Sequence, residues 1–206
     1  MAEFEKSFKK EADGIYRLKI PFQTVYTSVF LVIAKDGVAL VDSATTKEDV
    51  DEWICPALAE LGYTLEDLTY FVLSHRHYDH DGGLPRMLEI CPDIEVVETA
   101  KELFDGIYTY PLHGHAECCI GVLCERARTL IAGDGLQGNG LRDYPCNVPY
   151  QAAYLQTLAR VRADERIENV LFSHGYRPFD KDSLHGRDNV LFCLDECLRY
   201  VKGDTK

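Results

Sequence analysis

The sequence predicts a fold of the α/β class, on three observations. Short apolar runs recur along the chain, as at residues 28–34 and 70–73, and are typical of buried strands. Residues 14–20 alternate apolar and polar side chains, which is the pattern of a half-buried strand. Longer segments with apolar residues at helical spacing, such as 150–163 and 188–201, lie between or after these runs and predict helices.

The predicted elements follow one another with few long gaps. Strands are expected at residues 14–20, 28–34, 38–41, 70–73, 94–97, 107–111, 119–124, 128–132 and 169–172. Helices are expected at residues 47–61, 84–90, 99–104, 150–163 and 188–201. Residues 21–27 are expected to form a loop, and residues 135–149 form a glycine- and proline-rich loop long enough to contact a substrate. Because no linker or repeat divides the chain, residues 1–206 are predicted to form a single domain.

Length, composition and charge limit the classes of function. A chain of 206 residues with 46% hydrophobic content can bury the core of one domain, or of two small halves packed together. The formal net charge of −12 argues against a nucleic-acid partner, because phosphate backbones are bound by basic stripes. The sequence has neither the roughly eighteen consecutive apolar residues of a membrane helix nor a signal peptide. We therefore expect a cytoplasmic protein that acts on a small molecule, which can be anionic, without nucleic-acid or membrane partners.

The eight cysteines are spread along the chain without a Cys-x-x-Cys pair. In a chain of this length without an export signal, this distribution predicts reduced and mostly buried thiols rather than disulfides. Cys118 and Cys119 follow His115 closely, so one of the two could face a site at that histidine.

A cluster of three histidines and one aspartate predicts a metal site. His75 and His77 follow the apolar strand at 70–73, and their spacing of two places both imidazoles on one face, where they can bind one ion. Asp79 and His80 lie beyond the strand end, cannot continue that alternation, and are expected to bind a second ion. Imidazole and carboxylate groups are common ligands of divalent metals, and the sequence lacks the His-Glu-x-x-His motif of zincins.

Further polar residues come at the ends of other predicted strands. Asp42 ends the strand at 38–41 and is expected to be a structural carboxylate that accepts hydrogen bonds from the metal-site loops. Asp134 follows a predicted strand as a candidate metal ligand, with an ordinary turn residue as the alternative. His174 follows the strand at 169–172 and is a further candidate.

The motif His75-x-His77-x-Asp79-His80 resembles the signature of the metallo-β-lactamase-fold hydrolases, a superfamily that includes glyoxalase II, metallo-lactonases and zinc β-lactamases. Further landmarks of that superfamily occur in the same order, namely Asp42, Gly114-His115, Ala132-Gly133-Asp134 and Ser173-His174-Gly175. The resemblance covers about residues 14–180. It implies an αββα four-layer sandwich with the site at one edge between the sheets.

The resemblance also implies a dinuclear centre with seven ligands. One ion would be held by His75, His77 and His115, and the other by Asp79, His80 and His174, with Asp134 bridging the two. Asp79 and Asp134 would be the catalytic carboxylates. The ions would be Zn²⁺, with Mn²⁺ and Fe²⁺ as alternatives, and a bridging hydroxide would cleave a small ester, lactone or thioester.

The segment His113-Gly114-His115 contains two histidines, and only His115 is expected to bind metal. Gly114 permits a backbone turn that directs the following residue toward the metals. His113 directly follows Pro111-Leu112, so we expect it at the rim of the pocket or behind a ligand.

Two alternative functions come from other classes. One is an iron-dependent oxygenase resembling persulfide dioxygenases, and the other is a non-catalytic binding protein with structural metals. Histidine rather than an acid at His77 favours a zinc hydrolase over the diiron oxygen-reducing branch of the resembled superfamily. Tyr108, Tyr144 and Tyr150 are candidate hydrogen-bond donors to an oxyanion.

Overall fold

The computed structural model describes residues 4–138, 140–141, 144–177 and 181–203. The chain divides into two compact units, Met1–Glu98 (the N-terminal unit) and Thr99–Lys206 (the C-terminal unit). Each unit has its own six-stranded mixed sheet and its own helices, which confirms the predicted α/β class. The two units are described separately below.

The sheet of the N-terminal unit has the strand order β1-β2-β3-β4-β5-β6. Its strands are β1 Lys9–Ala12, β2 Ile15–Phe22, β3 Val25–Ala34, β4 Gly37–Val41, β5 Tyr70–Val72 and β6 Glu95–Val97. The first four strands pair antiparallel, whereas β5 pairs parallel to both β4 and β6. Because parallel neighbours need crossover connections, helical segments link β4 to β5 and β5 to β6. β5 lies between β4 and β6, so the segment that follows it begins in the middle of the parallel part of the sheet.

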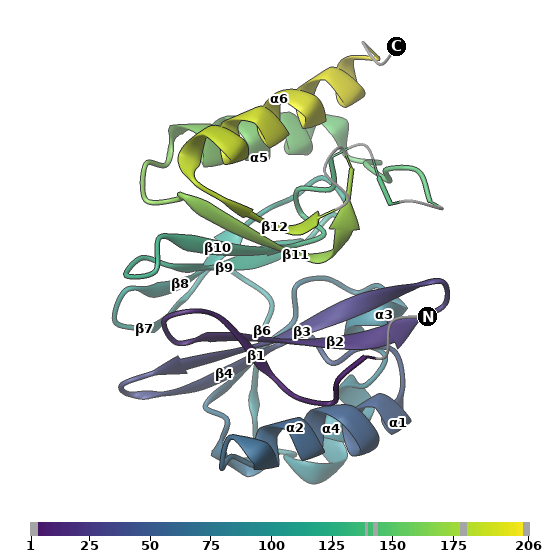
Figure 1. Ribbon diagram of the computed structural model, residues 1–206, viewed down its shortest axis with the longest axis vertical. Helices are drawn as coiled ribbons and strands as arrows, with labels where there is room; N and C mark the ends of the chain where they lie inside the picture. Colours follow the sequence, from purple (N-terminus) through teal and green to yellow (C-terminus); the bar gives the residue numbers. More distant parts are fainter. Residues whose placement is uncertain (1–3, 139, 142–143, 178–180, 204–206) are drawn as a thin grey trace. The chain divides into compact units, whose positions relative to one another are not determined.

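The helical segments of the N-terminal unit are short. They are α1 Lys47–Asp49, the π-helical turn Val50–Ile54, α2 Cys55–Glu60, the 3₁₀ turn Leu65–Asp67, α3 Tyr78–Asp81 and α4 Leu84–Ile90. Figure 1 shows α1, α2 and α4 along the same side of the sheet. The first helix begins at Thr46, whose hydroxyl accepts a hydrogen bond from the backbone N–H of Asp49 at 3.1 Å. Leu40 and Phe71 from the strands pack with Ile54 and Leu58 from the helices in one buried cluster.

The sheet of the C-terminal unit has the strand order β12-β11-β10-β9-β8-β7. Its strands are β7 Glu102–Phe104, β8 Ile107–Pro111, β9 Ile120–Cys124, β10 Thr129–Gly133, β11 Asn169–Tyr176 and β12 Lys181–His185. Only β10 and β11 pair parallel, and all other neighbours pair antiparallel. Since β10 and β11 are adjacent and parallel, the residues that follow β10 lie beside the carboxyl end of β11.

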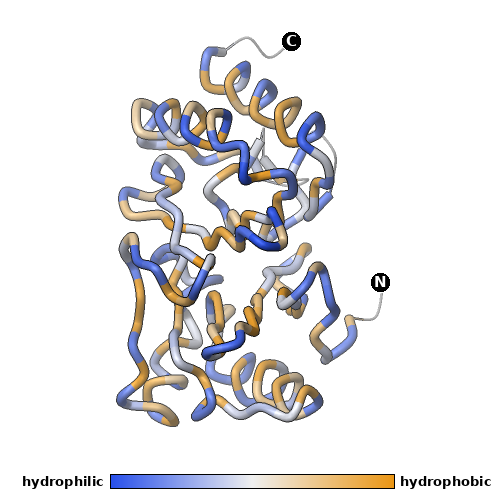
Figure 2. The backbone as a smooth tube through the Cα atoms, turned by 90° about the vertical axis from the view of Figure 1, so that its left-hand side faces the viewer, coloured by the Kyte–Doolittle hydropathy of each residue, from blue (hydrophilic) through white to orange (hydrophobic). Residues whose placement is uncertain are grey.

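Two helices, α5 Gln151–Ala163 and α6 Arg187–Lys202, lie on one side of this second sheet (Figure 1). Along α6, hydrophobic and hydrophilic residues alternate with the helical turn, as Figure 2 shows by its orange and blue segments. Val190, Leu194 and Cys197 on its apolar side are buried in a cluster with Tyr154 and Leu158 of α5. Both predicted helices are thus confirmed, and their apolar stripes form core.

The predicted loop at residues 21–27 is wrong. β2 continues to Phe22 and β3 already begins at Val25, so the segment is the tip of a long hairpin. Gln23 adopts a φ of 50°, which lets two residues make the turn, and Pro21 pairs with Tyr26 within the ladder.

The predicted helix at residues 99–104 is also wrong. Residues Glu102–Phe104 form β7, which pairs antiparallel with β8. Pairing with a neighbouring strand outweighs a weak local helix preference in so short a segment. The edge strands β1 and β12 were not expected from the sequence.

Two expectations from composition can be compared with the structure. Five of the eight cysteines, Cys119, Cys124, Cys146, Cys193 and Cys197, are buried as predicted. Among the described residues, no helix combines the length and the apolar character needed to cross a bilayer.

Candidate metal site

The N-terminal unit places His75 and His77 shortly after β5. The strand itself ends at Val72, so both histidines lie in the extended segment that follows it and not in the strand. His75 Nε2 and His77 Nδ1 are 3.0 Å apart. Two nitrogens at 2.0–2.1 Å from one tetrahedral zinc are separated by about 3.3 Å. The two nitrogens therefore lie at a spacing that suits a shared ion.

Asp79 and His80 lie on the short helix α3, which was not predicted. His80 Nδ1 is 2.7 Å from Asp42 Oδ2, and the acceptor-only carboxylate requires the ring proton on Nδ1. The lone pair of His80 Nε2 then lies 3.4 Å from Asp79 Oδ2. Two acceptor atoms at this separation are suited to a cation between them.

Asp42 is the structural carboxylate that the sequence predicts. Its Oδ1 accepts a hydrogen bond from Ser74 N and its Oδ2 one from Ser74 Oγ, each at 2.8 Å. Asp42 Oδ2 also contacts the ring of His80. One side chain therefore holds both the segment before His75 and the ring of His80. Asp42 is 1% exposed and has a φ of 65°, so it holds this position with an uncommon backbone conformation.

The backbone around α3 is held by two further buried hydroxyls. Ser43 Oγ donates to the carbonyl of His80 at 2.9 Å, and Thr27 Oγ1 donates to the carbonyl of Asp79 at 3.1 Å. After α3 the chain passes very close to Ser43, because a Cβ on Gly83 would lie 2.2 Å from the Ser43 carbonyl oxygen. Glycine is needed there for this close approach.

The C-terminal unit brings His115, Asp134 and His174 together. Asp134 follows the end of β10, and His174 lies on its parallel neighbour β11. Asp134 Oδ2 is 3.5 Å from His115 Nε2, and Asp134 Oδ1 is 3.5 Å from His174 Nε2. One carboxylate thus presents each of its oxygens to a different imidazole, which is the arrangement of a bridging ligand.

The two histidines of the 113–115 segment have different partners. His113 Nδ1 accepts a hydrogen bond from Cys119 N at 3.3 Å, which ties its ring to the backbone. Gly114 has a φ of 142°, and a Cβ there would lie 2.5 Å from the Cβ of Tyr154. The glycine therefore allows the backbone to press against α5 and to direct His115 toward Asp134.

Two residues that the sequence did not indicate contact His115. The carbonyl oxygen of Asn147 is 2.8 Å from His115 Nδ1, and Gln137 Nε2 is 2.6 Å from the same nitrogen. Gln137 also accepts a hydrogen bond from Asn147 N through Oε1 at 3.0 Å. Gln137 lies within the predicted substrate loop at 135–149. In the sequence, the single feature that points to it is its position three residues after Asp134.

The donor set of both units fits divalent metal ions. Each of the described pairs of ligand atoms, 3.0 to 3.5 Å apart, matches the separation of about 3.3 Å between two ligands of one zinc ion. The atoms are imidazole nitrogens and carboxylate oxygens, which suit Zn²⁺, Mn²⁺ and Fe²⁺. The chain therefore carries His and Asp clusters able to bind metal.

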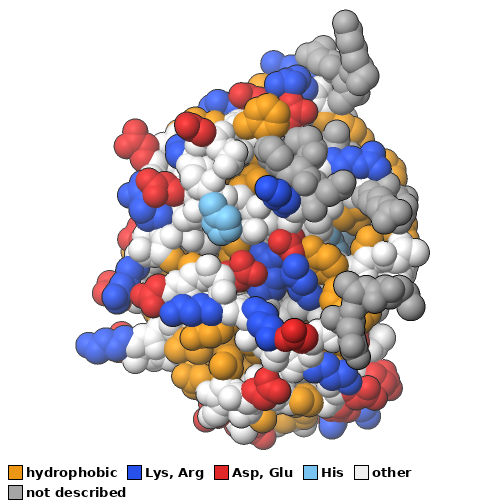
Figure 3. Space-filling model, viewed as in Figure 1, with side chains coloured by type: hydrophobic (Ala, Val, Ile, Leu, Met, Phe, Trp, Pro, Cys, Tyr) orange, Lys and Arg blue, Asp and Glu red, His pale blue; other side chains and the backbone are white. Residues whose placement is uncertain are grey.

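One buried thiol and one arginine near the candidate ligands have raised pKa values. Burial raises the pKa of the Cys146 thiol to about 12, with further contributions from Cys197 and Asp134, so this thiol is protonated. Arg76, between two ligand histidines in sequence, pairs with Glu98, whose hydrogen bond raises the pKa of the guanidinium. On the face of the molecule in Figure 3, Lys and Arg side chains lie among Asp and Glu rather than in one stripe.

The three tyrosines differ in their placement. Tyr108 pairs with Leu123, which pairs with Leu130, four residues before Asp134. At a strand rise of about 3.3 Å per residue, this puts the Tyr108 backbone roughly 13 Å from Asp134 along the sheet, and its role as an oxyanion donor stays a prediction. Tyr150 lies much nearer to His115, because its N–H donates to the carbonyl of Gly114 at 3.1 Å.

Comparison with known proteins gives matches to parts of the sequence and to the fold. The sequence model of the metallo-beta-lactamase superfamily matches residues 23–106. Atrochrysone carboxyl ACP thioesterase of Aspergillus fumigatus is 24% identical over an alignment 156 residues long, which covers 64% of this chain and 36% of the relative. Nitric oxide reductase of Moorella thermoacetica is 32% identical over 90 residues, or 44% of this chain and 21% of the relative. The matches thus span about a third and a fifth of these relatives.

A solved structure matches over nearly the whole chain. A metallo-beta-lactamase family protein from Thermus thermophilus has a TM-score of 0.68 at 17% identity, covering 94% of this chain and 81% of that protein. This match, with two helix-flanked mixed sheets, confirms the predicted metallo-β-lactamase α/β sandwich fold. The chain thus has the metallo-β-lactamase fold, and its residues 23–106 match the sequence model of that superfamily.

Proposed function

We propose that the chain is a metal-dependent hydrolase with a dinuclear centre. All seven predicted ligands take part, with one ion held by His75, His77 and His115, the other by Asp79, His80 and His174, and Asp134 shared between them. The proposal rests on Asp134, whose two oxygens each lie 3.5 Å from a different imidazole nitrogen, His115 Nε2 and His174 Nε2. A carboxylate that served only as a turn residue would not need two histidines at its two oxygens.

The metal ions would supply a water with a pKa near 7 and would polarise the oxygen of the bond to be cleaved. Other side chains hold and orient the metal ligands. Asp42 keeps the Nδ1 proton of His80 in place, so that Nε2 presents its lone pair. Asp79, an acceptor-only carboxylate at the start of α3, can orient a water hydrogen.

Zinc is the proposed metal at both positions. The pair His75 and His77 offers two neutral nitrogens 3.0 Å apart, and zinc binds imidazole nitrogen readily. An acid at the place of His77 would shift the balance of ligands toward oxygen and toward iron or manganese.

The proposed substrates are small esters, lactones and thioesters, with a thioester first. The thioesterase relative supports the thioester, because its match covers 64% of this chain. The net charge of −12 does not exclude an anionic substrate, since bound dications make a site locally positive.

Elemental analysis of the natively purified protein, paired with an ester, lactone, thioester and phosphoester screen, tests the proposal. We expect two zinc ions per chain and turnover of at least one small acyl substrate. Metal-loaded protein that turns over no substrate of any class in the screen would favour the alternative of a non-catalytic binding protein. A crystal structure of the loaded protein with His75 and His174 more than about 10 Å apart would contradict one dinuclear centre, because the metals of such centres lie roughly 3.5 to 4 Å apart.

A second candidate is an iron-dependent oxygenase or oxidoreductase. The observation in its favour is the nitric oxide reductase match, which has the higher identity of the two curated relatives at 32%. Iron after native purification and oxygen consumption with a persulfide would support this candidate. Zinc with persulfide-independent hydrolysis would exclude it.

A further inference from the structure

The ring of His115 is contacted at one nitrogen by two groups that require opposite protonation of that nitrogen. The carbonyl oxygen of Asn147, 2.8 Å from His115 Nδ1, can only accept and needs a proton on Nδ1. Gln137 Nε2, 2.6 Å from the same atom, can only donate and needs a bare Nδ1.

The orientation of the Gln137 amide follows from its other contact. Asn147 N is a backbone donor, so the Gln137 atom 3.0 Å from it must be the acceptor Oε1. The amide nitrogen is therefore the atom that faces His115. Gln137 is only 5% exposed, so exchange of these contacts for water is costly.

Each tautomer of His115 consequently has a partner on this chain. With the proton on Nε2, Gln137 donates to Nδ1, and the protonated Nε2 lies 3.5 Å from Asp134 Oδ2. With the proton on Nδ1, the ring donates to Asn147 and Nε2 presents a lone pair. Only the second form can bind a metal through Nε2.

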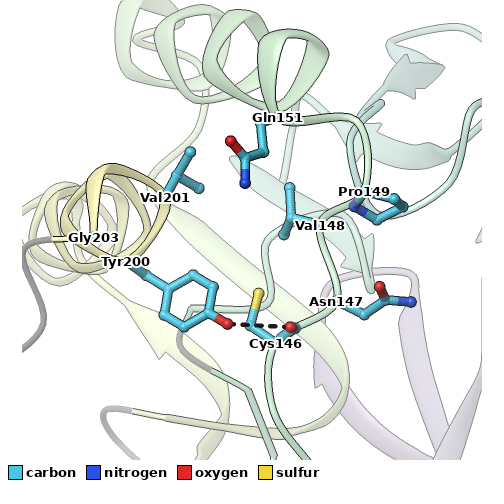
Figure 4. Close-up of a pocket in the computed structure, with 8 residues that line it drawn as sticks. All are labelled: Cys146, Asn147, Val148, Pro149, Gln151, Tyr200, Val201 and Gly203. Atoms are coloured by element: carbon cyan, nitrogen blue, oxygen red, sulfur yellow. Dashed lines mark hydrogen bonds between the residues drawn. The ribbon is translucent and has the colours of Figure 1, made fainter.

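The Asn147 carbonyl is a fixed acceptor. Its residue is held by Gln137 on one side, and the preceding carbonyl of Cys146 accepts a hydrogen bond from Tyr200 Oη at 3.3 Å (Figure 4). The opposite side of this segment, including Val148, lines a pocket of about 410 Å³ together with Tyr200. Both hydrogen bonds therefore hold the segment that carries the Asn147 carbonyl.

We propose that Gln137 is a positioning residue that favours the metal-free tautomer of His115 and thereby weakens metal binding at this histidine. The proposal deepens the proposed function, since it rests on His115 being a metal ligand. Gln137 makes the ion at His115 exchange more readily than it would if residue 137 accepted a hydrogen bond from His115 Nδ1. Metal loading would include transfer of the ring proton from Nε2 to Nδ1.

Gln137→Glu tests the inference, because a carboxylate accepts from both Asn147 N and His115 Nδ1–H and removes the competing donor. Gln151→Glu is the matched control, since it adds the same charge at the exposed start of α5. The zinc-loaded full chains are titrated with a competing chelator. We expect Gln137→Glu to hold the zinc at His115 about tenfold or more tightly than the wild type, and Gln151→Glu to match the wild type.

Imidazole ¹⁵N shifts of His115 in metal-free protein give a second readout, which a purely structural role would not move. We expect the wild type to carry the Nε2 proton and Gln137→Glu the Nδ1 proton, with His115→Ala assigning the signal. A Gln137→Glu variant that loses zinc as easily as the wild type, or a wild type already protonated at Nδ1, would overturn the inference. A wild type that binds no metal would refute the proposed function, and the ring shifts would still decide which tautomer Gln137 favours.

Discussion

Asp42→Asn should weaken both the fold of the N-terminal unit and its metal binding. The carboxylate accepts three hydrogen bonds, from Ser74 N, Ser74 Oγ and His80 Nδ1, at 2.7 to 2.8 Å. An amide keeps one acceptor oxygen and places a donor where the other oxygen was. Asparagine tolerates the φ of 65° at this position, so the change isolates the hydrogen bonds from backbone strain.

The magnitude follows from the number of bonds lost. Hydrogen bonds to charged groups contribute about 1.5–3 kcal/mol each, and a buried donor without an acceptor costs about 1–3 kcal/mol. We expect the free energy of unfolding to fall by about 2–3 kcal/mol, since at least one of the three donors loses its acceptor. For a chain of this size, that corresponds to a melting temperature lower by roughly 4–12 °C. Release of the His80 ring should lower metal affinity about 10- to 100-fold.

The assay is urea unfolding of metal-free protein together with zinc competition against a chelator. Asp36→Asn, the same chemical change at the exposed turn between β3 and β4, is the control and should stay within about 0.5 kcal/mol of the wild type. If Asp42→Asn also stays within that range and retains its zinc, the hydrogen bonds of Asp42 do not position the site.

Three further predictions concern other residues. Asp134→Ala should abolish turnover while circular dichroism and unfolding show an intact fold; near wild-type hydrolysis would show that the shared-ligand assignment is wrong. His115→Ala should lose roughly tenfold or more in affinity for one ion, whereas His113→Ala should retain both, as measured by metal content after dialysis against a weak chelator; the reverse result would move the ligand to His113. Hydrogen bonds from Arg166 hold the pKa of Asp164 below its ordinary value. The pair therefore stabilises the fold at pH values above the pKa of about 3.9 that the carboxyl has in the unfolded chain, and this stabilisation is lost as the pH falls through the lower pKa of the folded state. Acid unfolding of Asp164→Asn should therefore depend less steeply on pH below about 4, and an unchanged slope would contradict the assignment.

The candidate ligands could be named from the sequence because their chemistry is local. His75, His77, Asp79 and His80 fall within six residues of one another after a strongly apolar run, and few other roles call for that composition. Helix α6 could likewise be predicted, since its apolar residues recur at helical spacing and become core. Both inferences depend on neighbours in sequence, which a single chain displays directly.

The local sequence pattern predicted the wrong conformation where pairing with distant residues decides it. Residues 21–27 became a hairpin tip because β2 and β3 pair through to Phe22 and Val25, and residues 102–104 became a strand because β8 lies alongside. Short segments have weak conformational preferences of their own, so the neighbouring strand determines the outcome.

The tertiary structure alone decided how the ligands are held. Asp42 meets Ser74 and His80 across 32 and 38 residues, and Gln137 meets His115 across 22. These contacts depend on which strands become parallel neighbours and on where the following segments turn, and no spacing in the sequence encodes them. The sequence therefore determined which groups can bind metal, whereas the packing of each unit determined which ring nitrogen each histidine can present, because a hydrogen bond at one nitrogen fixes the proton on the other.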